Sequence, residues 1–299
     1  MATSISIGTS KNTDFICSQL GKELSFLQDE GIDILLEKKH RGDFTILDCS
    51  LPKAKKPEQE MILRHYVANA ISDTILHQWE HAILRKITKN HYYYLSLEEK
   101  EKVLKKAKQI LESVSLNGDS TYLQYQLNRK SKILQQVLDY LSLNDEINID
   151  GFIRFRLHDY QEDLNRVIEQ AVDEMMLEKE YQEFIMLLKY FIDIQEPKLT
   201  KVHIYLLPNG SFQLFDEQNQ PVNKQFLDGC IIGMIDNEIN YEDLLITALV
   251  SIAPQELVLH LPESTELGST FQTLEGVFGS RLEVCHSCPR CNKNHPASH

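Results

Sequence analysis

The chain has 299 residues, with 44 acidic against 31 basic side chains and a formal net charge of -13 at pH 7. The acidic excess lies in the second half, where residues 143–198 carry 14 acidic and 6 basic side chains and residues 199–299 carry 12 and 5. Because nucleic-acid binding depends on Lys and Arg neutralising phosphates, this balance argues against a nucleic-acid partner. No apolar run approaches the roughly 20 residues of a membrane helix and no secretory signal opens the chain, so we expect a cytoplasmic protein without a membrane segment.

The first segment, residues 1–51, predicts a small βαββ unit. A strand over residues 3–8 is followed by a helix that ends at Gly31, where glycine is typical of a helix end. Two further runs, residues 32–38 and 43–49, have the composition of strands and are separated by a turn. We therefore expect one helix packed against a small sheet.

The second segment, residues 57–197, predicts a central helical body. After a linker rich in Pro and Lys, residues 58–89 have the pattern of one long helix with apolar side chains on several sides. Two more helices are expected over residues 96–113 and 120–143. Ser96 with Glu99 matches a capping box at the start of the first of them.

A His-x-x-Glu-His sequence lies inside the first of these helices, at His77, Glu80 and His81. On a helix the two histidines lie one turn apart and could bind one Zn²⁺, with Glu80 placed to act on a bound water. Glu146 and Glu162 are downstream acids, but nothing singles out either as a third ligand. Because the motif is short and this spacing arises by chance, polar helix residues are the simpler interpretation.

Residues 147–194 form the apolar centre of the helical body. Apolar side chains recur every three or four residues, as one long helix or a helix pair requires, and acidic residues occupy the other side. Asp150 is placed to cap the start of this helix. The acidic face from Asp159 to Glu178 is a candidate surface for a protein partner, although solvation alone would explain it.

The consecutive residues INIDGFIRFRLHDY and EYQEFIMLLKYFIDIQEP, which begin and end this stretch, resemble the YtxC-like family of sporulation proteins. The resemblance is strongest over residues 147–197 and extends over most of the remaining chain. It implies a cytoplasmic protein of an endospore-forming bacterium with a link to sporulation. It brings no catalytic residues, so we expect a non-enzymatic protein that acts through protein partners.

After Pro197 the hydrophobic period changes from that of a helix to that of strands. A Pro-Asn-Gly turn separates two predicted strands, residues 202–206 and 212–215. Helices and strands then alternate, which predicts a small α/β domain over residues 199–284. The expected elements are a helix over 241–253, a strand over 256–261, a helix over 270–278 and a strand over 281–284.

The C-terminal tail, residues 285–299, is rich in Cys and His. Cys285, Cys288 and Cys291 form two overlapping Cys-x-x-Cys units, and His295 follows them. In a reducing cytosol this spacing indicates metal binding, and three thiolates with one imidazole would make a tetrahedral zinc site. The alternatives for the imidazole ligand are His286 and His299.

Other interpretations of the tail stay open. An iron–sulfur cluster would need His295 or a distant cysteine, because only three thiolates are clustered. A thiol-redox pair or a tail without a specific role would also fit the sequence. The scattered cysteines lie among apolar residues and are expected to be small buried hydrophobic side chains; they are Cys17, Cys49 and Cys230.

Together these patterns predict an α+β protein with a small N-terminal βαββ unit, a central helical body, a small C-terminal α/β domain and a Cys/His-rich tail. The leading hypothesis is a sporulation-associated, non-enzymatic cytoplasmic protein with a structural zinc in its tail. The alternative is a metal-dependent hydrolase that uses residues 77–81, followed by a thiol-redox or iron–sulfur protein.

Overall fold

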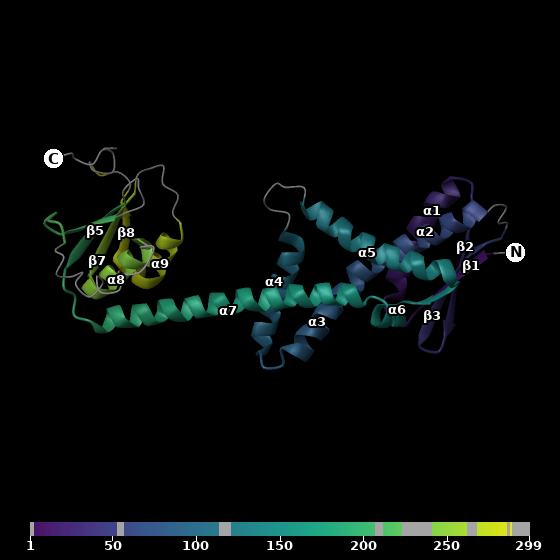
Figure 1. The fold of residues 1–299 in the computed structure, drawn as a ribbon, viewed down its shortest axis with the longest axis horizontal. Helices are drawn as coiled ribbons and strands as arrows, with labels where there is room; N and C mark the ends of the chain where they lie inside the picture. Colours follow the sequence, from purple (N-terminus) through teal and green to yellow (C-terminus); the bar gives the residue numbers. More distant parts are fainter. Residues whose placement is uncertain are drawn as a thin grey trace. The chain divides into compact units, whose positions relative to one another are not determined.

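A computed structural model describes the chain over residues 3–52, 57–113, 121–206, 212–222, 241–261, 268–285 and 288. The chain divides into two compact units, Met1–Met176 and Leu177–His299, and the boundary falls inside the long helix α7 (His158–Ile194). Each unit combines a sheet with helices (Figure 1), which confirms the predicted α+β class. The finer division into four segments stays a prediction.

A four-stranded sheet opens the first unit, with the strand order β2-β3-β1-β4. The predicted strands are confirmed as β1 (Thr3–Thr9), β2 (Leu35–Arg41) and β3 (Phe44–Leu51), and each neighbouring pair is antiparallel. The fourth strand, β4 (Glu146–Asn148), lies parallel to β1 and follows all the helices from α1 to α5 in the chain. The sequence pattern did not predict a strand at the start of residues 147–194, or that it would complete this sheet.

Helix α1 (Thr13–Asp29) contributes one apolar face to the core of the first unit. The buried side chains recur at intervals of three or four residues, as helical periodicity predicts. They are Ile16, Leu20, Leu24 and Leu27. Gly31 follows with a φ of 80°, a left-handed conformation that glycine adopts without steric cost after a helix end.

The predicted long helix over residues 58–89 is interrupted. The two α-helices, α2 (Pro57–Thr74) and α3 (Glu80–His91), are separated by a π-helical segment, Ile75–Trp79. This wider turn changes which side chains face inward, and it buries both Ile75 and Trp79. The His-x-x-Glu-His sequence therefore spans the junction between π-helix and α-helix.

Helices α4 (Leu97–Ser113) and α5 (Thr121–Leu143) follow at the predicted places. The capping box is confirmed at the start of α4. The Glu99 N–H donates to Ser96 Oγ at 3.2 Å, and the Ser96 N–H donates to the Glu99 carboxylate at 2.9 Å.

The apolar centre predicted over residues 147–194 contains a short helix, α6 (Ile149–Phe155), which is followed by α7 after a break. Asn148 caps α6, because its Oδ1 accepts a hydrogen bond from the Gly151 N–H at 2.8 Å. The prediction that Asp150 is the cap is wrong. Its carboxylate instead accepts hydrogen bonds from the Ser10 N–H at 2.9 Å and the Ser10 hydroxyl at 2.7 Å, which ties the helix to the loop after β1.

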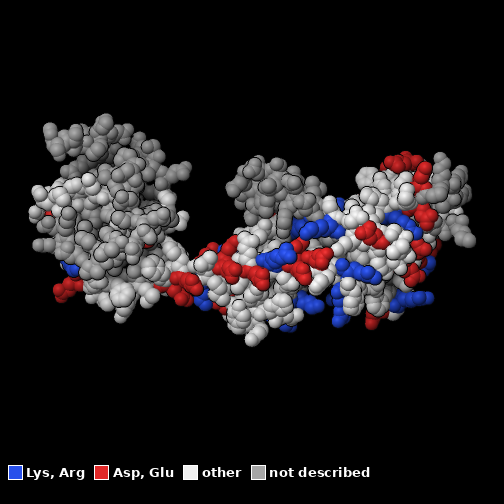
Figure 2. All heavy atoms as spheres, viewed as in Figure 1, with Lys and Arg blue, Asp and Glu red and all other residues white. Residues whose placement is uncertain are grey.

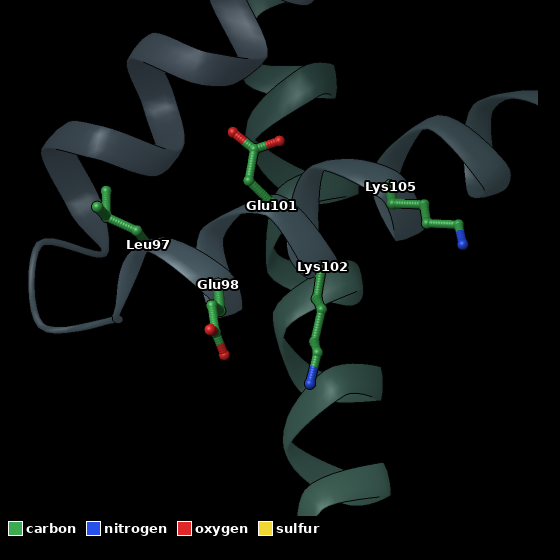
Figure 3. Close-up of a pocket in the computed structure, with 5 residues that line it drawn as sticks. All are labelled: Leu97, Glu98, Glu101, Lys102 and Lys105. Carbon is green, nitrogen blue, oxygen red and sulfur yellow. The ribbon is translucent and has the colours of Figure 1, made fainter.

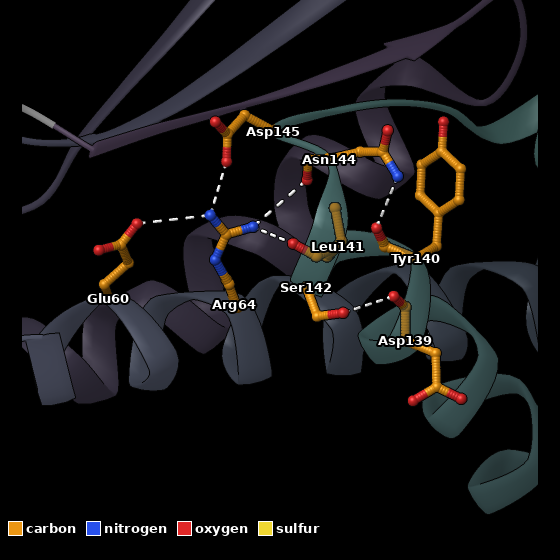
Figure 4. A network of polar contacts seen from close by, with 8 residues as sticks. All are labelled: Glu60, Arg64, Asp139, Tyr140, Leu141, Ser142, Asn144 and Asp145. Atoms are coloured by element: carbon orange, nitrogen blue, oxygen red, sulfur yellow. Dashed lines mark hydrogen bonds and ion pairs between the residues drawn. The ribbon is translucent and has the colours of Figure 1, made fainter.

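Arg64 on α2 binds the C-terminal end of α5 and the residues after it (Figure 4). Its guanidinium donates to the carbonyl oxygens of Leu141 and Asn144. It also pairs with Asp145 at 2.6 Å and more loosely with Glu60 at 3.4 Å. Because the last carbonyls of a helix lack donors within the helix, a half-buried cation at this position supplies both hydrogen bonds and a favourable charge.

Replacing Arg64 with Ala is expected to lower the free energy of unfolding by about 1.5–3 kcal/mol, the range for hydrogen bonds that involve a charged group. Arg85→Ala is the matched control, because Arg85 meets Glu101 at 3.4 Å with the two side chains 57% and 68% exposed. Such an exposed pair contributes about 1 kcal/mol at most. Urea unfolding of both variants tests the difference, and equal losses would contradict it.

The second unit contains a mixed sheet with the strand order β6-β5-β7-β8. Strands β5, β7 and β8 are parallel to one another, and β6 pairs antiparallel with β5. Two helices, α8 and α9, lie beside these strands (Figure 1). The bounds are β5 (Lys201–Leu206), β6 (Phe212–Asp216), α8 (Tyr241–Ile252), β7 (Glu256–His260), α9 (Ser269–Phe278) and β8 (Leu282–Cys285).

One face of this sheet forms the core of the second unit. Alternate residues of β5 and β7 pack there with apolar side chains of α8, α9 and the end of α7. The strand residues are Val202, Ile204, Leu257 and Leu259, and the helix residues include Leu245, Leu249, Leu274, Val277, Ile185 and Ile192. Because side chains alternate along a strand, the residues between them project from the opposite face.

The surface of α7 within the first unit is acidic, and Figure 2 shows Asp and Glu side chains along this helix with some Lys and Arg beside them. Four of the predicted acids are exposed there, namely Asp159, Glu162, Glu169 and Asp173. Of the helices that the structure describes, none has both the length and the apolar character needed to span a bilayer.

Candidate metal centre

The carboxyl ends of the parallel strands in the second unit carry a row of polar and aromatic side chains. The register aligns Tyr205 on β5 with His260 on β7, and His260 with Cys285 on β8. Residues aligned in this way project from the same face of a sheet. The carboxyl edge of parallel strands is also where α/β proteins commonly bind ligands.

Three possible metal ligands meet at this edge. His260, Cys285 and Cys288 each offer a ligand atom, and these atoms all lie within 4.8 Å of one another. His260 is 7% exposed, whereas the two cysteines are half-buried. The backbone supports the arrangement, because the Leu261 N–H donates to the Cys285 carbonyl oxygen at 3.2 Å and joins the chain segments that hold the ligands.

The distances suit a tetrahedral ion with nitrogen and sulfur ligands. His260 Nδ1 and Cys288 Sγ are 3.4 Å apart. On a tetrahedral zinc, bonds of about 2.0–2.3 Å place a nitrogen and a sulfur ligand roughly 3.5 Å from each other. Thiolate and imidazole donors also favour zinc over magnesium or calcium, which prefer oxygen. The described residues therefore fit three of the four positions of a zinc site.

The other side of the His260 ring has polar and aromatic neighbours from β5. His260 Nε2 lies 3.0 Å from His203 Nδ1, and the two ring centroids are 5.2 Å apart. Tyr205 stacks on His260 with the centroids 4.2 Å apart and the planes 6° from parallel. The imidazole is thus held in place by residues that do not themselves belong to the group of possible ligands.

The structure brings together two of the four predicted tail ligands, Cys285 and Cys288. Cys291 and His295 lie outside the described residues, so their part in the site stays a prediction. The residue that sequence reasoning missed is His260. The sequence does show a histidine at the end of the buried strand ELVLH. Its place beside Cys285, however, follows only from the register of β7 with β8.

The alternative site at residues 77–81 has a different arrangement. Glu80 accepts hydrogen bonds from Arg129 at 2.6 Å and from the Tyr160 hydroxyl, which both attach to the same carboxylate oxygen. His77 and His81 are exposed, and His77 Nδ1 lies 2.7 Å from the Asp73 carbonyl oxygen. Among the described residues, the group with metal-ligand spacing is the one around His260.

A surface hollow of about 490 Å³ lies on α4 and is lined by a mixture of apolar, acidic and basic side chains (Figure 3). All five residues come from this one helix, and Leu97 among them is 83% exposed. They are Leu97, Glu98, Glu101, Lys102 and Lys105. Because acidic and basic side chains both line it, the hollow has the character of a solvated helix surface.

Two of the remaining cysteines belong to the core of the first unit. Cys49 is fully buried, and burial raises the pKa of its thiol to about 12. Cys17 packs against the same core and is half-buried. Both therefore have the predicted role of small hydrophobic side chains, and Cys230 lies outside the described residues.

The fold and the site define an α+β protein whose second unit gathers two cysteines and a histidine at the carboxyl edge of a mixed sheet. The model of the YtxC-like family matches residues 65–283, so the chain belongs to the YtxC-like family. The match includes His203 and His260 and ends just before Cys285.

A curated relative is the uncharacterized protein YtxC of Bacillus subtilis (strain 168), which is 29% identical over 195 residues. The aligned part covers 64% of this chain and 66% of that protein, just under two thirds of its length. No solved structure matches the chain.

Proposed function

We propose that the chain is a sporulation-associated, non-enzymatic protein of the cytoplasm that acts through protein partners and holds a structural zinc in its second unit. The observation that carries the metal assignment is the convergence of His260, Cys285 and Cys288 at one edge of the sheet. The sporulation link rests on the resemblance to the YtxC-like family. Thiols gathered beside an imidazole are typical of metal sites in a reducing compartment.

A zinc at this position would connect the tail to the folded sheet. Cys288 lies beyond the last strand, whereas His260 and Cys285 end β7 and β8. A metal bound to all three would fix the chain after β8 against the sheet edge, which is the usual contribution of a structural zinc. The fourth ligand is proposed to come from Cys291 or His295.

The partner-binding part of the proposal concerns the acidic surface of α7. Asp159, Glu169 and Asp173 are exposed in the same stretch of helix. Such a surface attracts a partner with basic side chains, and it speeds the encounter more than it strengthens the complex. Capture of partners from sporulating cells should therefore weaken as salt increases.

Metal content tests the zinc assignment directly. Elemental analysis of anaerobically purified protein is expected to find about one zinc per chain, as a single tetrahedral site requires. The zinc should be lost in His260→Ala and retained in His158→Ala, which removes an exposed histidine of α7. Iron with visible absorption would favour the iron–sulfur interpretation, and no metal in any variant would overturn the zinc proposal.

The sporulation part needs its own test. Deleting the gene in an endospore former is expected to reduce the yield of heat-resistant spores, and the wild-type gene should restore it. Restoration by His260→Ala at equal protein level would show that the metal is not needed for this role. Normal spore yield without the gene would overturn the link to sporulation.

A further inference from the structure

The two nitrogens of the His260 ring face different partners. Nδ1 lies 3.4 Å from Cys288 Sγ, on the side of the possible ligands, and Nε2 lies 3.0 Å from His203 Nδ1. With only 7% of the residue exposed, water has little access to either nitrogen. The protein itself must therefore satisfy both ring nitrogens.

The chemistry of an imidazole ligand then determines where the protons lie. A neutral imidazole carries one proton, and the nitrogen that binds a metal must be the one without it. If Nδ1 binds the metal beside Cys288, Nε2 carries the proton and donates it in the hydrogen bond. His203 Nδ1 is then the acceptor, so the proton of His203 lies on its Nε2.

We propose that His203 is a positioning residue that fixes the orientation and tautomer of His260, so that His260 Nδ1 faces the thiolates of Cys285 and Cys288. The inference rests on the proposed zinc site and identifies the residue that orients its histidine ligand. Histidine ligands in metal sites almost always donate their second N–H to an acceptor in the protein, and His203 Nδ1 lies 3.0 Å from His260 Nε2, at the place of such an acceptor.

The position of His203 in the sheet makes it suited to this role. It lies on β5, beside β7, and the register aligns it with Val258, two residues before His260 on the same face. Tyr205, which the register aligns with His260 itself, stacks on the imidazole and restrains its tilt. Without an acceptor at residue 203, His260 Nε2 would lose the neighbour that now lies 3.0 Å away, and rotation of the His260 ring would turn Nδ1 away from the thiolates.

The test compares the zinc affinity of the full-length wild type with three variants by competition against a chromophoric chelator. His203→Phe removes the acceptor and keeps an aromatic ring, and it is expected to weaken zinc binding about tenfold to a hundredfold. His203→Asn restores an acceptor oxygen near the place of Nδ1 and is expected to recover most of the loss. His158→Phe is the control, because it makes the same substitution at an exposed histidine of α7, and its affinity should equal that of the wild type.

A spectroscopic measurement separates positioning from general loss of structure. In ¹⁵N NMR spectra of the wild type loaded with ¹¹³Cd²⁺, the metal should couple to His260 Nδ1, and Nε2 should carry the proton. Coupling to Nε2 would overturn the inference even if His203→Phe fails to fold. Equal zinc affinity in His203→Phe and the wild type would overturn it as well.

The outcomes also distinguish the inference from the proposed function. If the wild type binds zinc and His260→Ala does not, the site stands whatever the His203 variants show. If His260→Ala keeps its zinc, the site is elsewhere and both ideas fail together.

Discussion

Replacing Glu80 with Gln is expected to lower the free energy of unfolding by about 3 kcal/mol, at the lower end of the range for breaking a buried ion pair. Glu80 accepts hydrogen bonds from Arg129 and Tyr160, and the Arg129 side chain is only 8% exposed. Gln keeps the shape of the side chain but removes its charge. The guanidinium would therefore lose the negative charge of Glu80 in a poorly solvated place, which is the main cost.

The matched control is Glu101→Gln, the same substitution in the ion pair with Arg85, whose side chains are 57% and 68% exposed. It should change the free energy of unfolding by about 0.5 kcal/mol or less. A double variant, Glu80→Gln with Arg129→Met, should lose less than the two single variants together, because the isolated charge is removed as well. Urea unfolding is measured for the wild type, Glu80→Gln, Arg129→Met, the double variant and Glu101→Gln.

Glu80→Gln also tests the alternative that the protein is a metal-dependent hydrolase. If residues 77–81 formed a zinc-dependent site, Glu80→Gln would abolish hydrolysis and leave stability unchanged. The bonds to Arg129 and Tyr160 instead favour a structural role for this carboxylate. Unchanged unfolding together with loss of a measurable hydrolytic activity would contradict our expectation.

Cysteine labelling is expected to divide the thiols into two groups with very different reactivity. The thiolate is the reactive form, and burial raises the pKa of Cys49 to about 12 from an ordinary 9.0. At neutral pH this lowers the thiolate fraction on the order of a thousandfold, before any effect of poor access. Cys49 should therefore stay unlabelled in the folded protein and react once urea unfolds it.

Cys285 and Cys288 should behave in the opposite way. They are half-buried, so iodoacetamide should modify them in protein stripped of metal. Added zinc should protect both, because a coordinated thiolate is withheld from the reagent. Peptide mass spectrometry identifies the labelled sites. Labelling of Cys285 and Cys288 at the same rate with and without zinc would contradict the proposed site.

Local patterns predicted much of the fold. Helix α1, the hairpin of β2 and β3, the capping box of Ser96 and Glu99, and the alternation of strands and helices after Pro197 all follow from periodicity and end signals within a few residues. The interruption at Ile75–Trp79 did not, because residues 58–89 have apolar side chains on several sides, so there is no single apolar stripe whose shift would mark a π-helical turn.

Local patterns could not predict features that depend on contacts between segments distant in the sequence. Strand β4 has three residues, too few for a periodic signal, and it exists because β1 offers it an edge. The pattern indicated Asp150 as the cap of α6, whereas Asn148 caps the helix and Asp150 binds Ser10, a residue distant in sequence. In the same way Cys285 and Cys288 were found from their spacing, whereas His260 joins them only through strand register.

The pairing of β1 with β4 has a consequence for how the protein is made. A ribosome that adds about 5–20 residues per second needs roughly 7–30 seconds to travel from the end of β1 to the start of β4. Throughout that interval the nascent chain presents an unpaired edge of β1, a place where strands of other chains can attach. The newborn protein is therefore open to such pairing during its own translation, and a chaperone bound near the ribosome exit would protect the free edge of β1 at that stage.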